Sequence, residues 1–312
     1  MFGRVFRPLA VVLELTKFRL SGLVVATTVA GYVLASRAPF SWAGLAAVAV
    51  GTALAALGAN GLNQWWEAER DALMLRTRER PIPSGQISRR AALGVALALA
   101  LCGVGVLAVF SNLLTAALGA GVVALYVLVY TPLKPRTSLA TLVGAVVGAV
   151  PPVMGWTAAA GGVGPGAWIL FAILFAWQIP HFLALAWMYR EDYGRGGYRM
   201  LPIGDPGGRV TFPVIVLYAL ALVPLGAGAF LTGTTGAISA GGGALLGCWF
   251  AALTLRLNRR RDDGSARRVF LASLAYLPLL LTLMMADRAP ASAVYPETAG
   301  PAQRVAGLPY AP

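Results

Sequence analysis

Residues 38–71 decide the fold of this chain and read APFSWAGLAAVAVGTALAALGANGLNQWWEAERD. The first 29 residues of this stretch carry no charge. An α-helix needs about 20 apolar residues to cross the hydrocarbon core of a bilayer. The stretch therefore predicts a membrane-spanning helix that ends in a cluster of acidic, amide and basic side chains.

Three oxygen-bearing side chains recur every four residues at the end of this helix: Asn63, Glu67 and Asp71. A step of four residues turns an α-helix by only about 40°, so the three share one face, whereas Glu69 falls on another. Carboxylate and carboxamide oxygens are hard ligands of the kind that Mg²⁺ takes, usually together with substrate phosphates. The stripe predicts a metal site, and the alternative is a cluster that merely caps or hydrates the helix end.

Basic residues follow the stripe directly, with Arg70, Arg76, Arg78 and Arg80 inside eleven residues. Guanidinium groups bind phosphate through two parallel hydrogen bonds, and a metal on the stripe would neutralise the same phosphate from the other side. This pattern favours a diphosphate ligand. The positive-inside rule alone would also place arginines at a cytoplasmic helix end.

The composition of the whole chain is that of an integral membrane protein, with 58% hydrophobic and 12% charged residues. Six uncharged runs contain the predicted spans: 20–36, 38–66, 91–133, 137–189, 210–255 and 269–286. The three longest runs each fit two helices, with turn-forming residues at 111–112, 161–166 and 232–236. We therefore expect an all-α protein with nine transmembrane helices in one domain, residues 1–287, and a disordered tail, residues 288–312.

The basic residues are distributed unequally between the two sides of the membrane. With nine spans, 22 of the 25 Lys and Arg residues lie on the side of the N-terminus, which predicts a cytoplasmic N-terminus. We expect a protein of the bacterial plasma membrane whose charged cluster faces the cytoplasm. The net charge of +13 also attracts anionic lipid and anionic substrates, whereas no pattern of basic and aromatic residues indicates nucleic-acid binding.

Two further segments on the cytoplasmic side carry polar side chains. The fourth span ends in Tyr130-Thr-Pro-Leu-Lys134-Pro-Arg136, and the loop after the sixth span contains Glu191 and Asp192. The loops after the second and sixth spans are similar in layout, and carboxylates from these two halves of the protein could bind two divalent ions around one diphosphate, which would make the diphosphate a better leaving group. The alternative is that Glu191 and Asp192 are solvated loop residues.

Four stretches of the chain resemble the motifs of the UbiA superfamily of intramembrane prenyltransferases: residues 63–71, 76–85, 130–134 and 177–182. Within that superfamily they resemble the branch that acts on haem. The resemblance implies transfer of a farnesyl group from farnesyl diphosphate to a vinyl group of haem B. It also implies Mg²⁺ as the cofactor and a downstream haem-handling membrane protein as a partner.

The resemblance also implies roles for individual residues. Asn63, Glu67, Asp71 and Lys134 would act in catalysis, the first three as the first metal motif. Glu191 and Asp192 would form the second metal motif, although glycine stands at position 196, where the superfamily often has a further aspartate. Substrate contacts would come from six residues: Arg76, Arg80, Tyr130, Arg136, His181 and Arg195.

His181 is the only histidine of the chain and follows Pro180 within the sixth predicted span. In one interpretation its imidazole donates a hydrogen bond to a backbone carbonyl that the proline frees. In the other, favoured by the resemblance, it is an axial contact to the iron of the haem acceptor.

Three other functions remain open at this point. A structural haem-binding membrane protein would need paired axial ligands, whereas the chain has a single histidine. A related prenyltransferase with an aromatic or chlorin acceptor would keep the motifs at 63–71 and 76–85. An ion-coupled transporter would also carry buried carboxylates, but transporters place their ion sites near the middle of broken helices.

The predicted topology can be tested with reporter fusions after Gly85, Arg136, Gly204 and Gly264. All four fusions should report a cytoplasmic location, because their loops hold 18 of the 22 basic residues assigned to that side. A periplasmic signal from any one of these fusions would contradict the nine-span arrangement.

Overall fold

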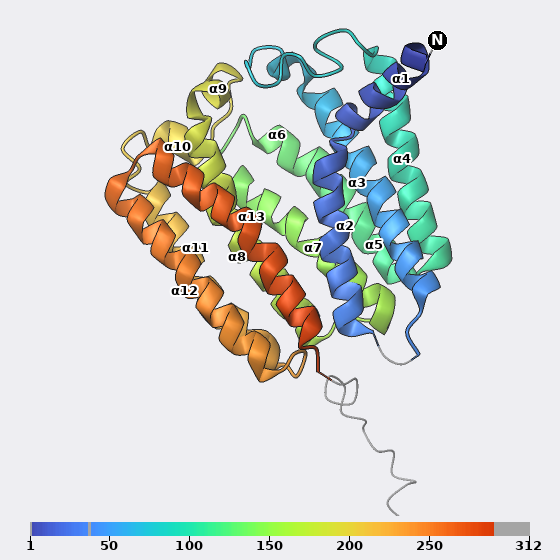
Figure 1. Ribbon diagram of the computed structural model, residues 1–312. Helices are drawn as coiled ribbons and strands as arrows, with labels where there is room; N and C mark the ends of the chain where they lie inside the picture. Colours follow the sequence, from blue (N-terminus) through green and yellow to red (C-terminus); the bar gives the residue numbers. More distant parts are fainter. Residues whose placement is uncertain (1, 37–38, 290–312) are drawn as a thin grey trace, which may run out of the picture.

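The computed structural model describes residues 2–36 and 39–289, and all of the regular elements in these ranges are helices (Figure 1). As predicted, nine helical segments in these ranges are long and apolar enough to cross a membrane. Eight of the spans are single helices: α2 (Phe18–Ala35), α3 (Trp42–Asp71), α4 (Arg89–Phe110), α7 (Ala140–Ala160), α8 (Pro165–Met188), α11 (Thr211–Leu231), α12 (Ala237–Arg260) and α13 (Asp263–Ala286). The fourth span joins α5 (Leu113–Ala124), the π-helical segment η1 (Leu125–Tyr130) and α6 (Thr131–Leu133). From residue 290 onward, the predicted tail lies outside the described residues.

The three predicted turns inside the long uncharged runs are confirmed. Asn112 precedes α5 and its side-chain oxygen accepts a hydrogen bond from the backbone N–H of Thr115, at 2.8 Å, which caps the helix. Gly161 ends α7 with a φ of 74°, a left-handed conformation that glycine adopts without steric cost. Between α11 and α12, the chain turns at residues 232–236.

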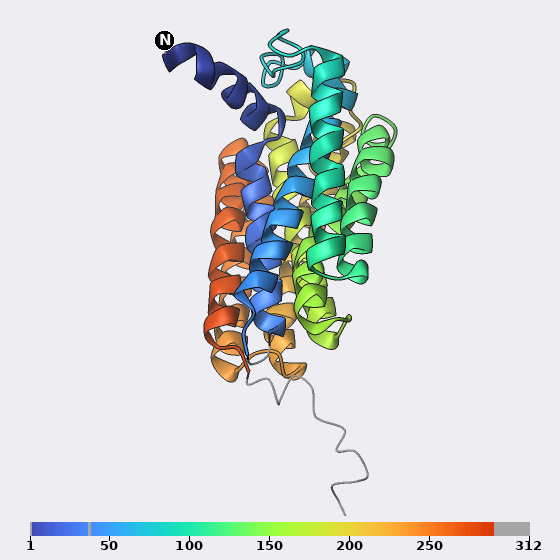
Figure 2. The same cartoon turned by 90° about the vertical axis from the view of Figure 1, so that its right-hand side faces the viewer.

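Three helices outside the spans were not predicted: α1 (Phe2–Leu15), α9 (Arg190–Arg195) and α10 (Leu201–Gly204). Helix α1 leaves the bundle at an angle (Figure 2). Lys17 joins it to α2 in a left-handed conformation, with a φ of 49°. This joint allows the chain to change direction as it enters the bundle.

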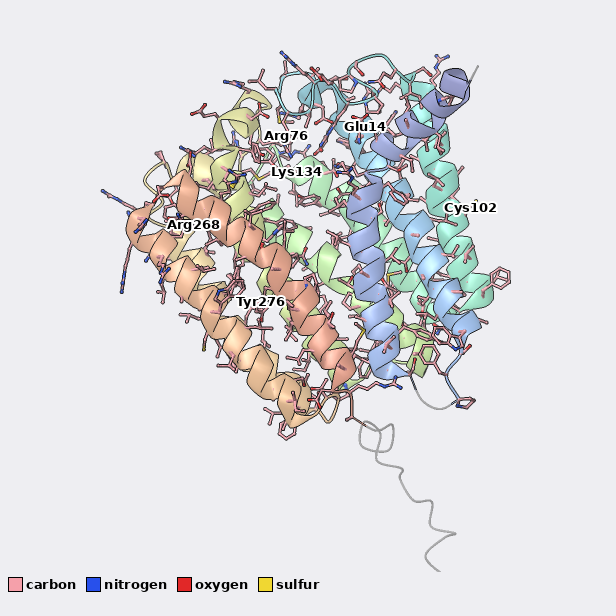
Figure 3. All side chains as sticks on the ribbon, viewed as in Figure 1. Glu14, Arg76, Cys102, Lys134, Arg268 and Tyr276 are labelled. Atoms are coloured by element: carbon pink, nitrogen blue, oxygen red, sulfur yellow. The ribbon has the colours of Figure 1, made fainter. Side chains whose placement is uncertain are left out.

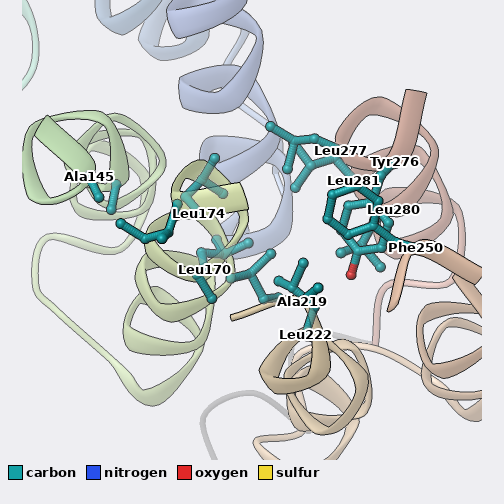
Figure 4. Close-up of a cluster of buried hydrophobic side chains, with 14 of the residues drawn as sticks. Ala145, Leu170, Leu174, Ala219, Leu222, Phe250, Tyr276, Leu277, Leu280 and Leu281 are labelled. Atoms are coloured by element: carbon teal, nitrogen blue, oxygen red, sulfur yellow. The ribbon is translucent and has the colours of Figure 1, made fainter. Parts of the chain in front are cut away.

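Helix α8 lies inside the bundle and packs against α7, α11 and α13, while α2 packs against α3, α7 and α13. The apolar cluster on the α8 side contains buried residues of six helices, part of which Figure 4 shows. Leu170 and Leu174 of α8, Leu222 of α11, Phe250 of α12 and Leu280 of α13 are all buried in it. The cluster holds α8 in place, and α8 carries the 177–182 motif.

Helices α3 and α4 approach closely through small residues. A Cβ added at Gly58 would press against the backbone of Ala100, and one added at Gly103 would press against the backbone of Ala55. Small residues allow such backbone approach in membranes, where close packing is a main source of helix association. The position of α3, and hence of its polar end, depends on these glycines.

We expect Gly58→Ala to destabilise the protein by about 1–3 kcal/mol, because the added methyl group forces α3 and α4 apart. The matched control is Gly105→Ala on α4, where an added Cβ meets nothing within 4 Å. Thermal unfolding in detergent should show a lower Tm for the first variant only. Equal Tm values for the two variants would contradict the close approach.

Candidate active site

The predicted stripe on α3 faces the inside of the bundle. Asn63 and Asp71 are fully buried and Glu67 is nearly so. Glu69 points outward and pairs on the surface with Arg89 at 2.8 Å. The helical period therefore correctly predicted that Glu67 and Asp71 face inward and that Glu69 faces outward.

Each side chain of the stripe holds a cation from a different segment. The Nζ of Lys17 donates to Asn63 Oδ1 at 2.8 Å, and the Nζ of Lys134 donates to Glu67 Oε1 at 2.7 Å. One guanidinium nitrogen of Arg80 lies 2.8 and 2.7 Å from the two carboxylate oxygens of Asp71. The structure thus brings Arg80 and Lys134 to the stripe, and adds Lys17, which the sequence analysis did not select.

The two lysines of this cluster differ in their electrostatics. Burial lowers the pKa of Lys17 to about 7, and the positive charges of Arg80 and Lys134 act in the same direction. Burial is the largest influence on Lys134 and acts to lower its pKa, but the carboxylate of Glu67 and the neighbouring tyrosines together outweigh it and hold that pKa well above its usual value. Lys134 therefore stays charged at neutral pH, while Lys17 is close to half-charged.

The π-helical segment η1 shapes the wall opposite α3. Tyr126 and Tyr130 stack with ring centroids 5.3 Å apart, and the Nζ of Lys134 lies 4.7 Å from the ring centroid of Tyr130. Thr131 donates to the backbone oxygen of Tyr126 at 2.8 Å and accepts from the amide nitrogen of Asn63 at 3.1 Å. Single π-helical turns frequently occur at functional sites, and this one links the 130–134 motif to the stripe.

Arg76 lies between two tyrosines of the loop that follows α8. Its guanidinium carbon is 4.9 Å from the ring centroid of Tyr189 and 5.5 Å from that of Tyr193. Arg76 and Lys134 lie at the same end of the bundle (Figure 3). The loops after α3 and α8 therefore meet above the stripe.

Asp192 connects these two loops. Its carboxylate accepts the backbone N–H groups of Leu75 at 2.7 Å and Arg76 at 3.2 Å. Arg195 lies 3.7 Å from the same carboxylate, and Glu191 is exposed. Glu191, Asp192 and Arg195 line a neighbouring hollow and do not reach the cavity of the stripe, so the two predicted metal motifs are not joined in this conformation.

One cavity of about 370 Å³ connects the charged cluster to an apolar interior. Its polar end is lined by seven of the residues discussed above: Lys17, Glu67, Asp71, Arg76, Arg80, Tyr130 and Lys134. Its apolar part is lined by Leu20, Val24, Ala56, Ala59, Val122, Val147, Pro151 and Phe182, among others. Leu20, which lines the cavity from the start of α2, is about half-exposed, at 49%.

Tyr198 is a further cavity residue that the sequence analysis missed. It is 4% exposed, and its hydroxyl makes no hydrogen bond of 3.5 Å or less within the described ranges, although the carboxylate of Glu67 lies close enough to act on it. Burial raises the pKa of Tyr198, and the nearby carboxylate of Glu67 acts in the same direction, so the hydroxyl keeps its proton. An unpaired buried donor beside Lys134 is available to a ligand.

His181 does not line this cavity. Its Nδ1 lies 2.7 Å from the hydroxyl oxygen of Ser273 on α13, so the expected partner, a backbone carbonyl freed by Pro180, is not the one observed. Arg136 is exposed at the end of the 130–136 segment and does not line the cavity. Their proposed substrate contacts remain predictions.

The donor set of the stripe fits Mg²⁺, because it consists of oxygen atoms only. Within residues 2–36 and 39–289, no three His, Cys, Asp or Glu side chains are gathered in a metal-binding arrangement. The stripe contributes two carboxylates and an amide, so a metal there would take its remaining ligands from a bound diphosphate or from water.

Sequence comparisons agree with these observations. The model of the UbiA prenyltransferase family matches residues 24–277. A protein of Solibacter usitatus named protoheme IX farnesyltransferase is 43% identical over 285 residues, covering 88% of this chain and 98% of the relative. The mitochondrial protein of the same name from Homo sapiens is 44% identical over 280 residues, but this chain spans only 62% of its length.

Solved structures share the fold at low sequence identity. A digeranylgeranylglyceryl phosphate synthase superposes with a TM-score of 0.75 at 16% identity, covering 89% of this chain and 98% of the other. A UbiA homologue from Archaeoglobus fulgidus bound to DMAPP and Mg²⁺ gives a TM-score of 0.67 at 15% identity, covering 88% of this chain and 98% of the other. With the match of the family model over most of its length, this chain belongs to the UbiA prenyltransferase family.

Proposed function

We propose that the protein transfers a farnesyl group from farnesyl diphosphate to a vinyl group of haem B. With the addition of one water molecule, the products are haem O and diphosphate. The observation that carries this proposal is a cavity with a cationic cluster at one end and an apolar lining at the other. The names of relatives at 43% and 44% identity support haem as the acceptor.

The cationic end of the cavity suits the leaving group. Breaking the C–O bond of an allylic diphosphate separates a carbocation from a highly charged anion, and fixed positive charges stabilise that anion. Arg76, Arg80 and Lys134 supply these charges, and Lys17 gains charge when an anion approaches, because an anion raises its pKa. Arg80 and Lys134 can turn from their carboxylates toward the diphosphate.

Mg²⁺ bound by Asn63, Glu67 and Asp71 would neutralise further charge on the diphosphate. The carboxylates of Glu67 and Asp71 already line the cavity at its polar end. The second motif would need Asp192 to leave its backbone partners, so we propose it as a site that forms only when substrate binds.

The apolar part of the cavity suits the farnesyl chain and its cation. Water must be excluded until the vinyl group attacks, and the lining of small aliphatic residues excludes it. Tyr126 and Tyr130 present aromatic rings at the boundary between the two ends, where a carbocation is stabilised by cation–π contact. The cavity continues toward a smaller one of about 30 Å³, with which it shares Val24, Ala56, Ala59, Val122 and Pro151.

We further propose that the charged end faces the cytoplasm of a bacterial cell, in line with the distribution of basic residues. The product would leave through the bilayer to a downstream haem-handling membrane protein. An ion-coupled transporter fits less well, because the stripe occupies the end of α3 and not the middle of a broken helix.

Chelation of divalent metal should abolish farnesyl transfer, and Glu67→Gln should lower kcat by about 100-fold or more, because both remove stabilisation of the departing charge. Glu69→Gln is the matched control and should be nearly neutral, since Glu69 points outward. Farnesyl transfer is measured in membranes that are supplied with haem B and farnesyl diphosphate, by mass spectrometry of the farnesylated haem. Equal losses in the two variants would refute the role of the inward stripe.

A stability measurement separates this role from folding. Glu67→Gln leaves Lys134 buried without its carboxylate and should destabilise the protein by about 3 kcal/mol. The double variant Glu67→Gln with Lys134→Met removes both charges and should recover most of the lost Tm. Its activity should stay as low as that of the single variant.

Tyr198→Phe should reduce kcat/KM by roughly 10- to 100-fold, the value of one hydrogen bond to a charged group. The Tm should not fall, because the hydroxyl that is removed has no partner among the described residues. Steady-state kinetics with farnesyl diphosphate as the varied substrate measure the effect. Unchanged kinetics would show that the hydroxyl does not contact the substrate.

A further inference from the structure

His181 of α8 and Ser273 of α13 form a polar pair outside the cavity of the stripe. Nδ1 of His181 and Oγ of Ser273 are 2.7 Å apart. The same Oγ lies 2.6 Å from the backbone carbonyl oxygen of Phe270. Ser273 is fully buried, so these two contacts satisfy its hydroxyl.

The two distances together determine which imidazole nitrogen carries the proton. A carbonyl oxygen can only accept, so the single hydroxyl hydrogen of Ser273 points toward Phe270. The contact with His181 is then a hydrogen bond only if Nδ1 donates to Oγ. In the neutral imidazole the other nitrogen, Nε2, therefore holds a free lone pair.

The surroundings of the ring hold its plane and leave Nε2 accessible. Trp177 and Phe270 both stack on the imidazole, with ring centroids 5.0 and 4.9 Å away. Nε2 has no hydrogen-bond partner in the described ranges and is not one of their buried unpaired polar atoms, so it reaches the molecular surface. The backbone oxygen of Ser273 accepts from the indole nitrogen of Trp177 at 2.8 Å, which fixes α8 against α13.

We propose that Ser273 is a positioning residue for the acceptor: it fixes His181 as the Nδ1–H tautomer and so presents Nε2 to the haem iron. This inference rests on the proposed function, because it takes haem as the acceptor. Metal-binding imidazoles characteristically donate their second ring hydrogen to an oxygen atom, which sets both tautomer and orientation. Ser273 supplies that oxygen here.

The position of the pair also suits the reaction. Phe182, the residue after His181, lines the cavity, and its ring centroid lies 5.7 Å from that of the imidazole. A haem bound at Nε2 would therefore lie near the wall that Phe182 contributes to the cavity.

The test is a titration of the purified protein in nanodiscs with ferric haem b, followed by its absorption spectrum. Ser273→Ala should weaken haem binding by about 10- to 100-fold and shift the Soret band toward that of His181→Ala. Binding of farnesyl diphosphate should be unchanged. Ser273→Thr keeps the hydroxyl and should restore both the affinity for haem and the spectrum.

Thr254→Ala on α12 is the matched control. The hydroxyl of Thr254 is also buried and also donates to the carbonyl oxygen three residues earlier, at 2.8 Å, but it has no histidine partner. Its loss should affect the Tm as the loss of Ser273 does and leave the haem spectrum unchanged.

Each outcome separates this inference from the proposed function. If the wild-type protein farnesylates haem and Ser273→Ala binds haem with native affinity and spectrum, the role of Ser273 is refuted and the function stands. The role is also refuted if Thr254→Ala weakens haem binding equally. If the wild-type protein neither binds nor farnesylates haem, the proposed function itself fails.

Discussion

The structure depends on the pairing of buried charges at the end of α3. An ion inside a membrane protein is costly unless an opposite charge or a strong hydrogen bond compensates for its lost hydration. Glu67 and Asp71 obtain that compensation from Lys134 and Arg80, and the amide oxygen of Asn63 accepts a hydrogen bond from Lys17, so three separate segments converge on the stripe. The start of α2, the end of the fourth span and the loop after α3 are therefore held around one cavity.

The same pairing explains how a cavity for an anion can exist without its ligand. Without internal carboxylates, the cations would repel each other and the cavity would fill with water or open. Glu67 and Asp71 offset part of the positive charge of four basic side chains, and the charge that remains is positive, as binding of an anion requires. In a site of this kind, the side chains that bind the anion are already held in place by their internal partners.

Much of this arrangement could be predicted from sequence because it depends on local periodicity. The nine spans followed from the length of uncharged runs, and the turns followed from residues such as Asn112 and Gly161. The separation of Glu67 from Glu69 followed from the pitch of one helix. Each of these features is determined within a single element.

The features that could not be predicted depend on contacts between distant elements. Lys17 lies next to Asn63 only because Lys17 itself adopts a left-handed conformation and turns the chain before α2. Tyr198 is recognisable as a cavity residue only once the loop after α8 is folded over α3. The partner of His181 lies on α13, 92 residues later, where no motif points to it. The π-helical turn of the fourth span was likewise not predicted.

The bond between Asp192 and the loop at Leu75 and Arg76 has a consequence for the order of events in a catalytic cycle. The bond joins the loops after α3 and α8 above the stripe. A product that leaves between these two loops must first break it. Opening of these loops then has its own rate, separate from that of the chemical step.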